Sequence, residues 1–258
     1  MNAMIPKSSS SQETSGTNKF RGITMDQTDN LKSDKKDILI GNFLIVLLIS
    51  IFAWGIWGAP TEEHMGEVYR IIYVHVPAAF TAFFSSAILF GLSIWAMLKR
   101  SEASMRWGQA CSEIGLLFTC LALATGSIWG KPTWGVWWTW DARLTTTLIL
   151  ALLFAGYLLL KSSLPAGPQR TRICGALGIM IFVNVYIVYK SVTWWRTLHQ
   201  PPSLMRSGEE STMDPEMRVV LLIASIFLIA VGYWLMKQRA KNLNIQAQLD
   251  QLSYDHLS

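Results

Sequence analysis

The chain has 258 residues, of which 51% are hydrophobic and only 15% are charged, whereas an average soluble domain has about 25% charged residues. Its mean hydropathy of +0.31 and its long uncharged runs exclude an ordinary soluble enzyme and favour a polytopic membrane protein. The net charge of +5 does not indicate a nucleic-acid-binding protein, because in a membrane protein the placement of Lys and Arg carries the information.

The first 37 residues are rich in Ser, Thr, Asn, Gln and Lys. A segment this polar cannot bury a hydrophobic core, so it predicts a disordered cytoplasmic tail. Met25 opens the stretch just before the first apolar run. The sequence therefore leaves both Met1 and Met25 open as the translation start.

Six apolar stretches follow the tail, and each is long enough to cross a bilayer, whose core of about 30 Å needs about 20 residues of helix. They predict an all-α, six-helix membrane domain over residues 38–238. Residues 239–258 are predicted to form a cytoplasmic C-terminal tail. The predicted spans cover approximately residues 39–58, 76–98, 109–129, 142–160, 173–191 and 217–236.

The basic residues between the spans predict the orientation of the chain. Clusters such as Lys99 with Arg100, and Arg170 with Arg172, fall in alternate connections, whereas the other connections carry few basic residues. Because cytoplasmic loops are enriched in Lys and Arg, both termini are predicted to lie in the cytoplasm. The segments at about 59–75, 130–141 and 192–216 are then predicted to lie on the outer side of the membrane.

The predicted spans are poor in ionisable residues. All four histidines lie outside them, and Glu113 is the carboxylate closest to a helix body. Proton and ion transporters place Asp, Glu or His near the bilayer midplane, and an electron-carrying cytochrome b holds its haems on histidines inside its helices. The sequence disfavours both classes.

The segment from Trp129 to Asp141 is exceptionally rich in tryptophan. It reads WGKPTWGVWWTWD, with Trp129, Trp134, Trp137, Trp138 and Trp140 within twelve residues. If residues 134–141 were helical, Trp134, Trp137, Trp138 and Asp141 would share one face. An interfacial anchoring belt is the plain alternative, but of the 12 tryptophans only Trp95, Trp107 and Trp234 fall near the predicted inner side. This asymmetry favours a binding surface for a flat apolar ligand.

Two outward histidines, His75 and His199, flank the tryptophan-rich segment in apolar and aromatic surroundings. Pro77 is predicted to lie in the first turn of the second span, which would put His75 at the outer mouth of that helix. Either histidine alone could be an ordinary solvated residue. Together with the tryptophans they fit a pair of axial ligands for a haem iron, because neutral imidazole binds iron and the macrocycle needs apolar walls. His64 and His256 are predicted to take no part.

The two carboxylates of a haem require cationic partners, and arginine can bind a carboxylate through two parallel hydrogen bonds. The candidates on the outer side are Arg70, Arg143 and Arg196, although each could instead anchor a lipid headgroup. Asp141 could be a haem contact, the N-cap of the fourth span, or both. The chain has no Cys-x-x-Cys-His motif for covalent haem attachment.

At these residues the sequence resembles the tryptophan-rich haem-handling proteins of cytochrome c maturation, most closely the CcmC family. The resemblance covers about residues 40–238. It is carried by the tryptophan-rich signature that runs on to Arg143, by RIIYVHVP from Arg70, and by VTWWRTLHQP, which contains His199.

The resemblance implies that haem b is bound non-covalently at the periplasmic face, with His75 and His199 as axial ligands and the tryptophan-rich segment as its platform. It further implies delivery of haem to the chaperone CcmE, beside the ABC transporter CcmA–CcmB and the small protein CcmD. The implied role is that of a haem-handling protein with no turnover site, although bound haem could promote its own attachment to the acceptor. The alternatives are a cytochrome c synthase-type haem lyase subunit, an unaided transmembrane haem exporter and a scaffold subunit.

Overall fold

The computed structural model describes residues 35–199 and 213–255. The chain divides after Leu44 into two units, and residues 35–44 of the first unit are helical. The predicted tail of residues 1–37 therefore lies outside the described residues, apart from its last three. Met25 and His256 also lie outside them.

The described residues contain six helices that are long and apolar enough to cross a membrane, as the sequence predicts. The protein is thus an all-α, multi-pass membrane protein. The first span is Lys35–Gly58, which ends in the π-helical turn η1 (Trp54–Gly58), and a 3-10 turn η2 (Glu67–Ile71) leads into the second span. The remaining helices are α2 (Ile72–Lys99), α3 (Glu102–Trp134), α4 (Ala142–Ser163), α5 (Pro168–Trp194) and α6 (Pro215–Asp255).

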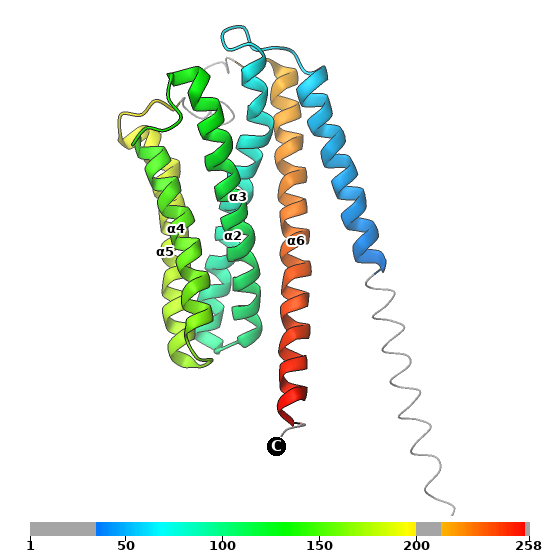
Figure 1. Ribbon diagram of the computed structural model, residues 1–258, viewed down its shortest axis with the longest axis vertical. Helices are drawn as coiled ribbons and strands as arrows, with labels where there is room; N and C mark the ends of the chain where they lie inside the picture. The colour runs from blue at the N-terminus through cyan, green and yellow to red at the C-terminus, as the bar shows by residue number, and fades with distance from the viewer. Residues whose placement is uncertain (1–34, 200–212, 256–258) are drawn as a thin grey trace, which may run out of the picture. The chain divides into compact units, whose positions relative to one another are not determined.

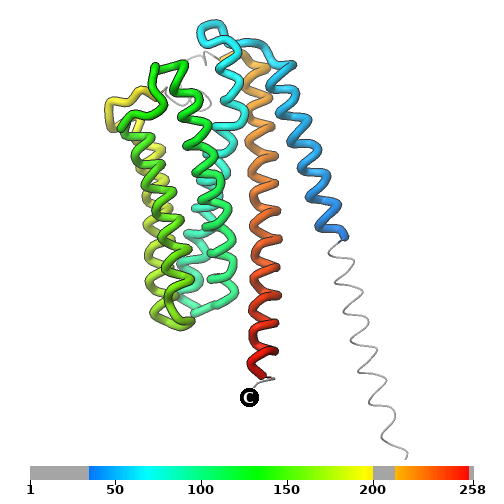
Figure 2. The backbone as a smooth tube through the Cα atoms, viewed as in Figure 1, coloured from blue at the N-terminus to red at the C-terminus, as the bar shows by residue number. Residues whose placement is uncertain are grey.

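Helices α2, α3, α4 and α5 form a closed ring, because α2 packs on α3, α3 on α4, α4 on α5, and α5 again on α2. Helix α6 packs against α2 and α3. Figures 1 and 2 show α2 to α6 running along one another. Short connections make α2 to α5 alternate in direction, so that the tryptophan-rich segment 129–141 and the end of α5 lie at the same end of the ring. We term it the tryptophan end.

The half of the ring away from the tryptophan end is filled by a close-packed apolar core. Phe154 and Tyr157 of α4 are fully or almost fully buried there. Gly115 of α3 allows Phe154 to approach, since a Cβ atom at Gly115 would lie 2.4 Å from that ring. Other buried members are Leu89, Ala96, Met105, Cys111, Leu150, Cys174, Ile181, Val185 and Met236. The centre of this half is occupied by side chains.

The connections at the tryptophan end have sequence-encoded boundaries. Helix α3 ends at Trp134 and is capped by Gly135, whose φ of +80° is a left-handed conformation that glycine adopts without strain. Asp141 then caps α4, because its side chain accepts a hydrogen bond of 2.8 Å from the backbone N–H of Arg143. The residues between these two caps are not helical.

The structure corrects two details of the sequence interpretation and adds one. Residues 134–141 are not a helical turn, since α3 stops at Trp134, and so Trp134, Trp137, Trp138 and Asp141 do not share a helical face. Pro77 is the sixth residue of α2 rather than part of its first turn, which places His75 within the helix. Helix α6 continues to Asp255, because residues 239–255 contain no Gly or Pro and the loss of hydropathy there does not end a helix.

Candidate functional site

A mainly apolar cavity of about 240 Å³ opens inside the tryptophan end of the ring. All four ring helices contribute to its walls, and Leu221 of α6 adds to them. Phe80, Phe83 and Leu123 are among its apolar lining residues. Both predicted ligand histidines, His75 and His199, line this one cavity although they are separated by more than 120 residues in the chain.

His75 is held between α2 and α3. Its Nδ1 atom lies 3.1 Å from the hydroxyl oxygen of Thr125. Its ring meets Trp129 edge to face, with the ring centroids 5.8 Å apart. Gly126 leaves room for the imidazole, because a Cβ atom there would lie 3.0 Å from His75 Cε1. The position of this imidazole is therefore set by contacts with the interior of α3.

His199 lies in the segment that follows the end of α5, and it lines the same cavity as His75. Its ring lies 5.0 Å from that of Trp134, at an interplanar angle of 60°. Its Nδ1 atom is 3.6 Å from Asp141 Oδ1, which is longer than a hydrogen bond. This buried nitrogen has no hydrogen-bond partner among the described residues.

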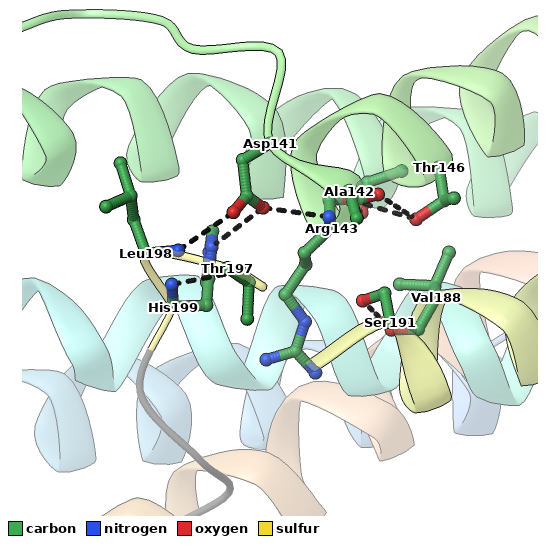
Figure 3. Close-up of polar contacts among 10 residues, drawn as sticks. Asp141, Ala142, Arg143, Thr146, Val188, Ser191, Thr197, Leu198 and His199 are labelled. Atoms are coloured by element: carbon green, nitrogen blue, oxygen red, sulfur yellow. Dashed lines mark hydrogen bonds and ion pairs between the residues drawn. The ribbon is translucent and has the colours of Figure 1, made fainter. Parts of the chain in front are cut away.

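Asp141 joins the tryptophan-rich segment to the segment that carries His199. Besides capping α4, its carboxylate accepts hydrogen bonds from the backbone N–H of Leu198, at 2.9 Å, and from Thr197. Figure 3 shows these contacts converging on the one carboxylate. Burial alone would raise the pKa of Asp141, but the hydrogen bonds outweigh it and lower the pKa below its usual value. Both predicted roles of Asp141, cap and site residue, are compatible with this geometry.

Arg143 projects from the first turn of α4 and lines the cavity. Within the described part of the chain its guanidinium makes no hydrogen bond or ion pair, and Asp141 acts on it only at longer range. A permanently charged group in a partly buried apolar site is costly unless an anion joins it. The cavity thus contains a cation suited to an anionic group of a ligand.

The tryptophans of the signature fall into two groups. Trp129 and Trp134 line the cavity, and the indole N–H of Trp129 is buried without a partner in the described structure. Trp137 and Trp140 are 58% and 76% exposed, and Trp138 packs edge to face on Trp140. These three do not line the cavity. Whether they contact a ligand outside it stays a prediction.

The other outward candidates lie away from the cavity lining. Arg70 is occupied, because its guanidinium donates to the carbonyl oxygens of Gly55 and Ala59 and pairs with Glu67. Arg196 and His64 are exposed and do not line the cavity. The structure therefore brings together His75, His199, Trp129, Trp134 and Arg143, and it gives Arg70 a role in fixing the first connection.

Sequence reasoning missed Thr125, which contacts His75 from behind the cavity wall. A signal was present, because Thr125 lies four residues before Trp129 and such residues share a helical face. It was overlooked because a threonine inside an apolar span has no distinctive pattern. Tyr189 of α5, which lines the cavity, was missed because a single tyrosine inside an apolar span has no distinctive pattern either.

The stability of the protein is expected to fall as pH is lowered from about 6.5 to 4. Burial and the charge of Arg143 lower the pKa of His199 to about 4, although Asp141 acts in the opposite direction. Between pH 4 and the ordinary histidine value near 6.5, the unfolded chain binds a proton at His199 that the folded chain does not. The free energy of unfolding therefore decreases as pH falls through this window.

Thermal unfolding of the ligand-free protein in nanodiscs between pH 7 and pH 4.5 measures this effect. His199→Gln should flatten the dependence, and His64→Gln, at an exposed site, should not. Equal slopes for wild type and His199→Gln would contradict the assignment. Asp141 adds to this dependence only near the acid end of the range, where the unfolded chain begins to protonate it while its lowered pKa keeps the folded carboxylate charged; this contribution is the same in wild type and His64→Gln.

Residues 28–253 match the family model CcmC, described as heme exporter protein C. Heme exporter protein C of Escherichia coli K12 is 38% identical over 204 residues, which cover 77% of this chain and 80% of that protein. The proteins of the same name from Haemophilus influenzae (38% identity, 75% of this chain and 78% of the relative) and Rhodobacter capsulatus (32%, 76% and 82%) are also similar.

Proposed function

The chain belongs to the CcmC family of heme exporter protein C, and from this premise we propose that it binds haem in the cavity at its tryptophan end and delivers it to the haem chaperone CcmE. Membership of the family gives it a part in haem handling during cytochrome c maturation. We further propose where haem binds, which residues ligate its iron, and that CcmE is the acceptor.

The observation that carries the proposal is that His75 and His199 line the same cavity. The lowered pKa of His199 keeps its imidazole neutral at physiological pH, which is the form that binds iron. The two histidines come from α2 and from the segment after α5, so they can approach a planar ligand from different elements. Apolar and aromatic walls around them suit the porphyrin ring.

The unmet donors of the cavity suit the two carboxylates of haem b. The Arg143 guanidinium can bind one carboxylate through two parallel hydrogen bonds, and the Trp129 indole N–H can donate one more. An anionic ligand group would offset the cost of leaving Arg143 unpaired in this site. We therefore assign haem b, bound non-covalently, as the cargo of this chain.

The same features favour handling of haem at one end of the bundle over passage through it. Side chains fill the other half of the ring around Phe154, and a cargo as large as haem needs an open path. We propose that the protein is not an enzyme, and that it presents haem to CcmE beside the transporter CcmA–CcmB and CcmD. The exposed Trp137 and Trp140 form an apolar surface at this end, and exposed apolar surfaces are common at protein interaction sites.

The tryptophan end is proposed to face the periplasm of the bacterial inner membrane. Basic residues gather at the other end, with Lys99 and Arg100 between α2 and α3, and Lys161 and Arg170 around the α4–α5 connection. Alkaline phosphatase fused after Val136 is expected to be active, and fusions after Ser101 or Gly167 are expected to be inactive. The reverse pattern would place both histidines in the cytoplasm and would contradict delivery to a periplasmic acceptor.

A transfer assay tests delivery itself. Haem-loaded protein in nanodiscs is mixed with purified ligand-free CcmE, and the absorption of each protein is measured after separation. We expect haem to move to CcmE faster than it moves to apomyoglobin, which takes up only haem that has already dissociated. Equal rates to both proteins would mean passive release and would remove CcmE as the specific acceptor.

A further inference from the structure

Thr125 is placed to control which nitrogen of His75 can bind a metal. It lies inside α3, one helical turn before Trp129, and its hydroxyl oxygen is 3.1 Å from His75 Nδ1. Thr125 is buried and does not itself line the cavity. Thr125 is therefore placed to act on a ligand in the cavity through His75, whose ring it contacts.

The hydrogen-bond pattern of Thr125 decides where the proton lies. Its hydroxyl has one hydrogen, and the backbone carbonyl of Leu121 lies 2.7 Å from the hydroxyl oxygen, with that of Ala122 at 3.2 Å. A hydroxyl that donates to the backbone can only accept from the imidazole. The carbonyl of Ala122, which can only accept, also interacts with the His75 ring. The Thr125 hydroxyl therefore favours a proton on His75 Nδ1.

We infer that Thr125 is a positioning residue that holds His75 in the tautomer protonated at Nδ1, which leaves Nε2 with a free lone pair for the haem iron. This inference rests on the proposed function, in which haem is the cargo. Metal-binding histidines generally donate their other N–H to such an acceptor, which fixes the ring and increases its basicity. Here the acceptor comes from the neighbouring helix, so the ligand is prepared before haem arrives.

His199 lacks an equivalent arrangement. Its buried Nδ1 has no hydrogen-bond partner among the residues that the structure describes, and the nearest carboxylate oxygen, from Asp141, is 3.6 Å away. The two histidines are thus unequally prepared. His75 is the preorganised ligand, while His199 sits on a segment outside the helices and completes the site.

The test is a titration of the full-length protein in nanodiscs with hemin, ferric protoporphyrin IX. Thr125→Val replaces the hydroxyl by a methyl group of similar size and is expected to weaken hemin binding about 10- to 100-fold, the usual effect of losing such an outer partner. Thr125→Ser keeps the hydroxyl and should bind as wild type does. The matched control is Thr81→Val, because Thr81 is also buried and donates to a carbonyl one turn earlier, Pro77 O at 2.8 Å, but does not touch a histidine.

A spectroscopic measurement separates positioning from general packing. In the His199→Ala background, where His75 is the remaining ligand, resonance Raman of the ferrous form gives the iron–histidine stretching frequency. Thr125→Val should lower this frequency, because a weaker hydrogen bond at Nδ1 makes Nε2 a weaker donor, and Thr125→Ser should restore it. Occupancy is normalised to folded, inserted protein. If Thr125→Val does not accumulate, Thr125→Ala makes the same comparison.

The outcomes distinguish this inference from the proposed function. Wild-type affinity together with an unchanged stretching frequency in Thr125→Val would overturn the role of Thr125 while leaving haem as the cargo. Equal losses in Thr125→Val, Thr125→Ser and Thr81→Val would also overturn it, since these would reflect packing. If the wild-type protein bound no hemin, the proposed function would fail first.

Discussion

Replacement of His75 or His199 by Ala is expected to lower haem affinity by more than about 100-fold, since loss of an outer-shell partner alone costs about 10- to 100-fold. In the proposed site each imidazole supplies one axial bond, and the cavity offers no other histidine in the described chain. The His75→Ala effect should be the larger, because His75 is fixed by α3 whereas His199 lies outside the helices. Hemin titration of nanodisc-inserted protein measures both.

His64→Ala provides the control for the histidine variants. His64 is exposed, and its backbone N–H is held by the Glu62 carboxylate, 2.9 Å away, so its side chain can be removed without disturbing that turn. It should keep wild-type affinity. Wild-type spectra and affinity in the His75→Ala, His199→Ala double variant would exclude this pair as ligands.

The second large effect is expected from the two cavity tryptophans. Replacement of both Trp129 and Trp134 by Ala should weaken haem binding by several kcal/mol, because each large ring contributes about 150–250 Å² of buried area and about 0.5–1.5 kcal/mol of ring geometry. Each ring also contacts one of the two proposed ligands, Trp129 that of His75 and Trp134 that of His199. Replacement of both by Phe should recover part of the loss, since ring stacking is kept on a smaller surface.

Trp137, which is exposed, and its neighbour Trp138 do not line the cavity, so their removal tests whether haem lies in the cavity or on the outer surface of the tryptophan-rich segment. If haem lies mainly in the cavity, removing this pair should cost much less affinity than removing Trp129 and Trp134, while transfer to CcmE slows. A larger loss from Trp137 and Trp138 would place the haem on the outer surface of the segment instead. Trp95→Ala, at the opposite end of α2, serves as the insertion control and should change neither quantity.

The fold could be predicted from the sequence because each span satisfies one strong physical condition, a run of apolar residues long enough for the bilayer. The ends of the helices were harder to predict from the sequence. Residues 239–255 lose the hydropathy of a span but keep the composition of a helix, so α6 continues to Asp255. The sequence was compatible with a helix over residues 134–141. Helix α3 instead stops before Gly135, because a glycine with positive φ terminates a helix.

The candidate site was predictable where unusual composition marked it and unpredictable where packing defines it. His75, His199, Trp129, Trp134 and Arg143 were all chosen from the sequence, and they line one cavity. The charge of Arg70 suggested a ligand partner, but its hydrogen bonds to backbone carbonyls depend on a turn that no pattern reveals. The contact between Thr125 and His75 joins two helices across 50 positions and arises only from tertiary structure.

Electron paramagnetic resonance of the full-length protein, loaded with hemin in nanodiscs and titrated to saturation, tests the central claim most directly. We expect one haem per chain with the low-spin ferric signal of two imidazole ligands, and a change of that signal in both His75→Ala and His199→Ala. Hemin uptake that does not saturate, or a high-spin signal unaffected by either substitution, would contradict a haem held between these two histidines.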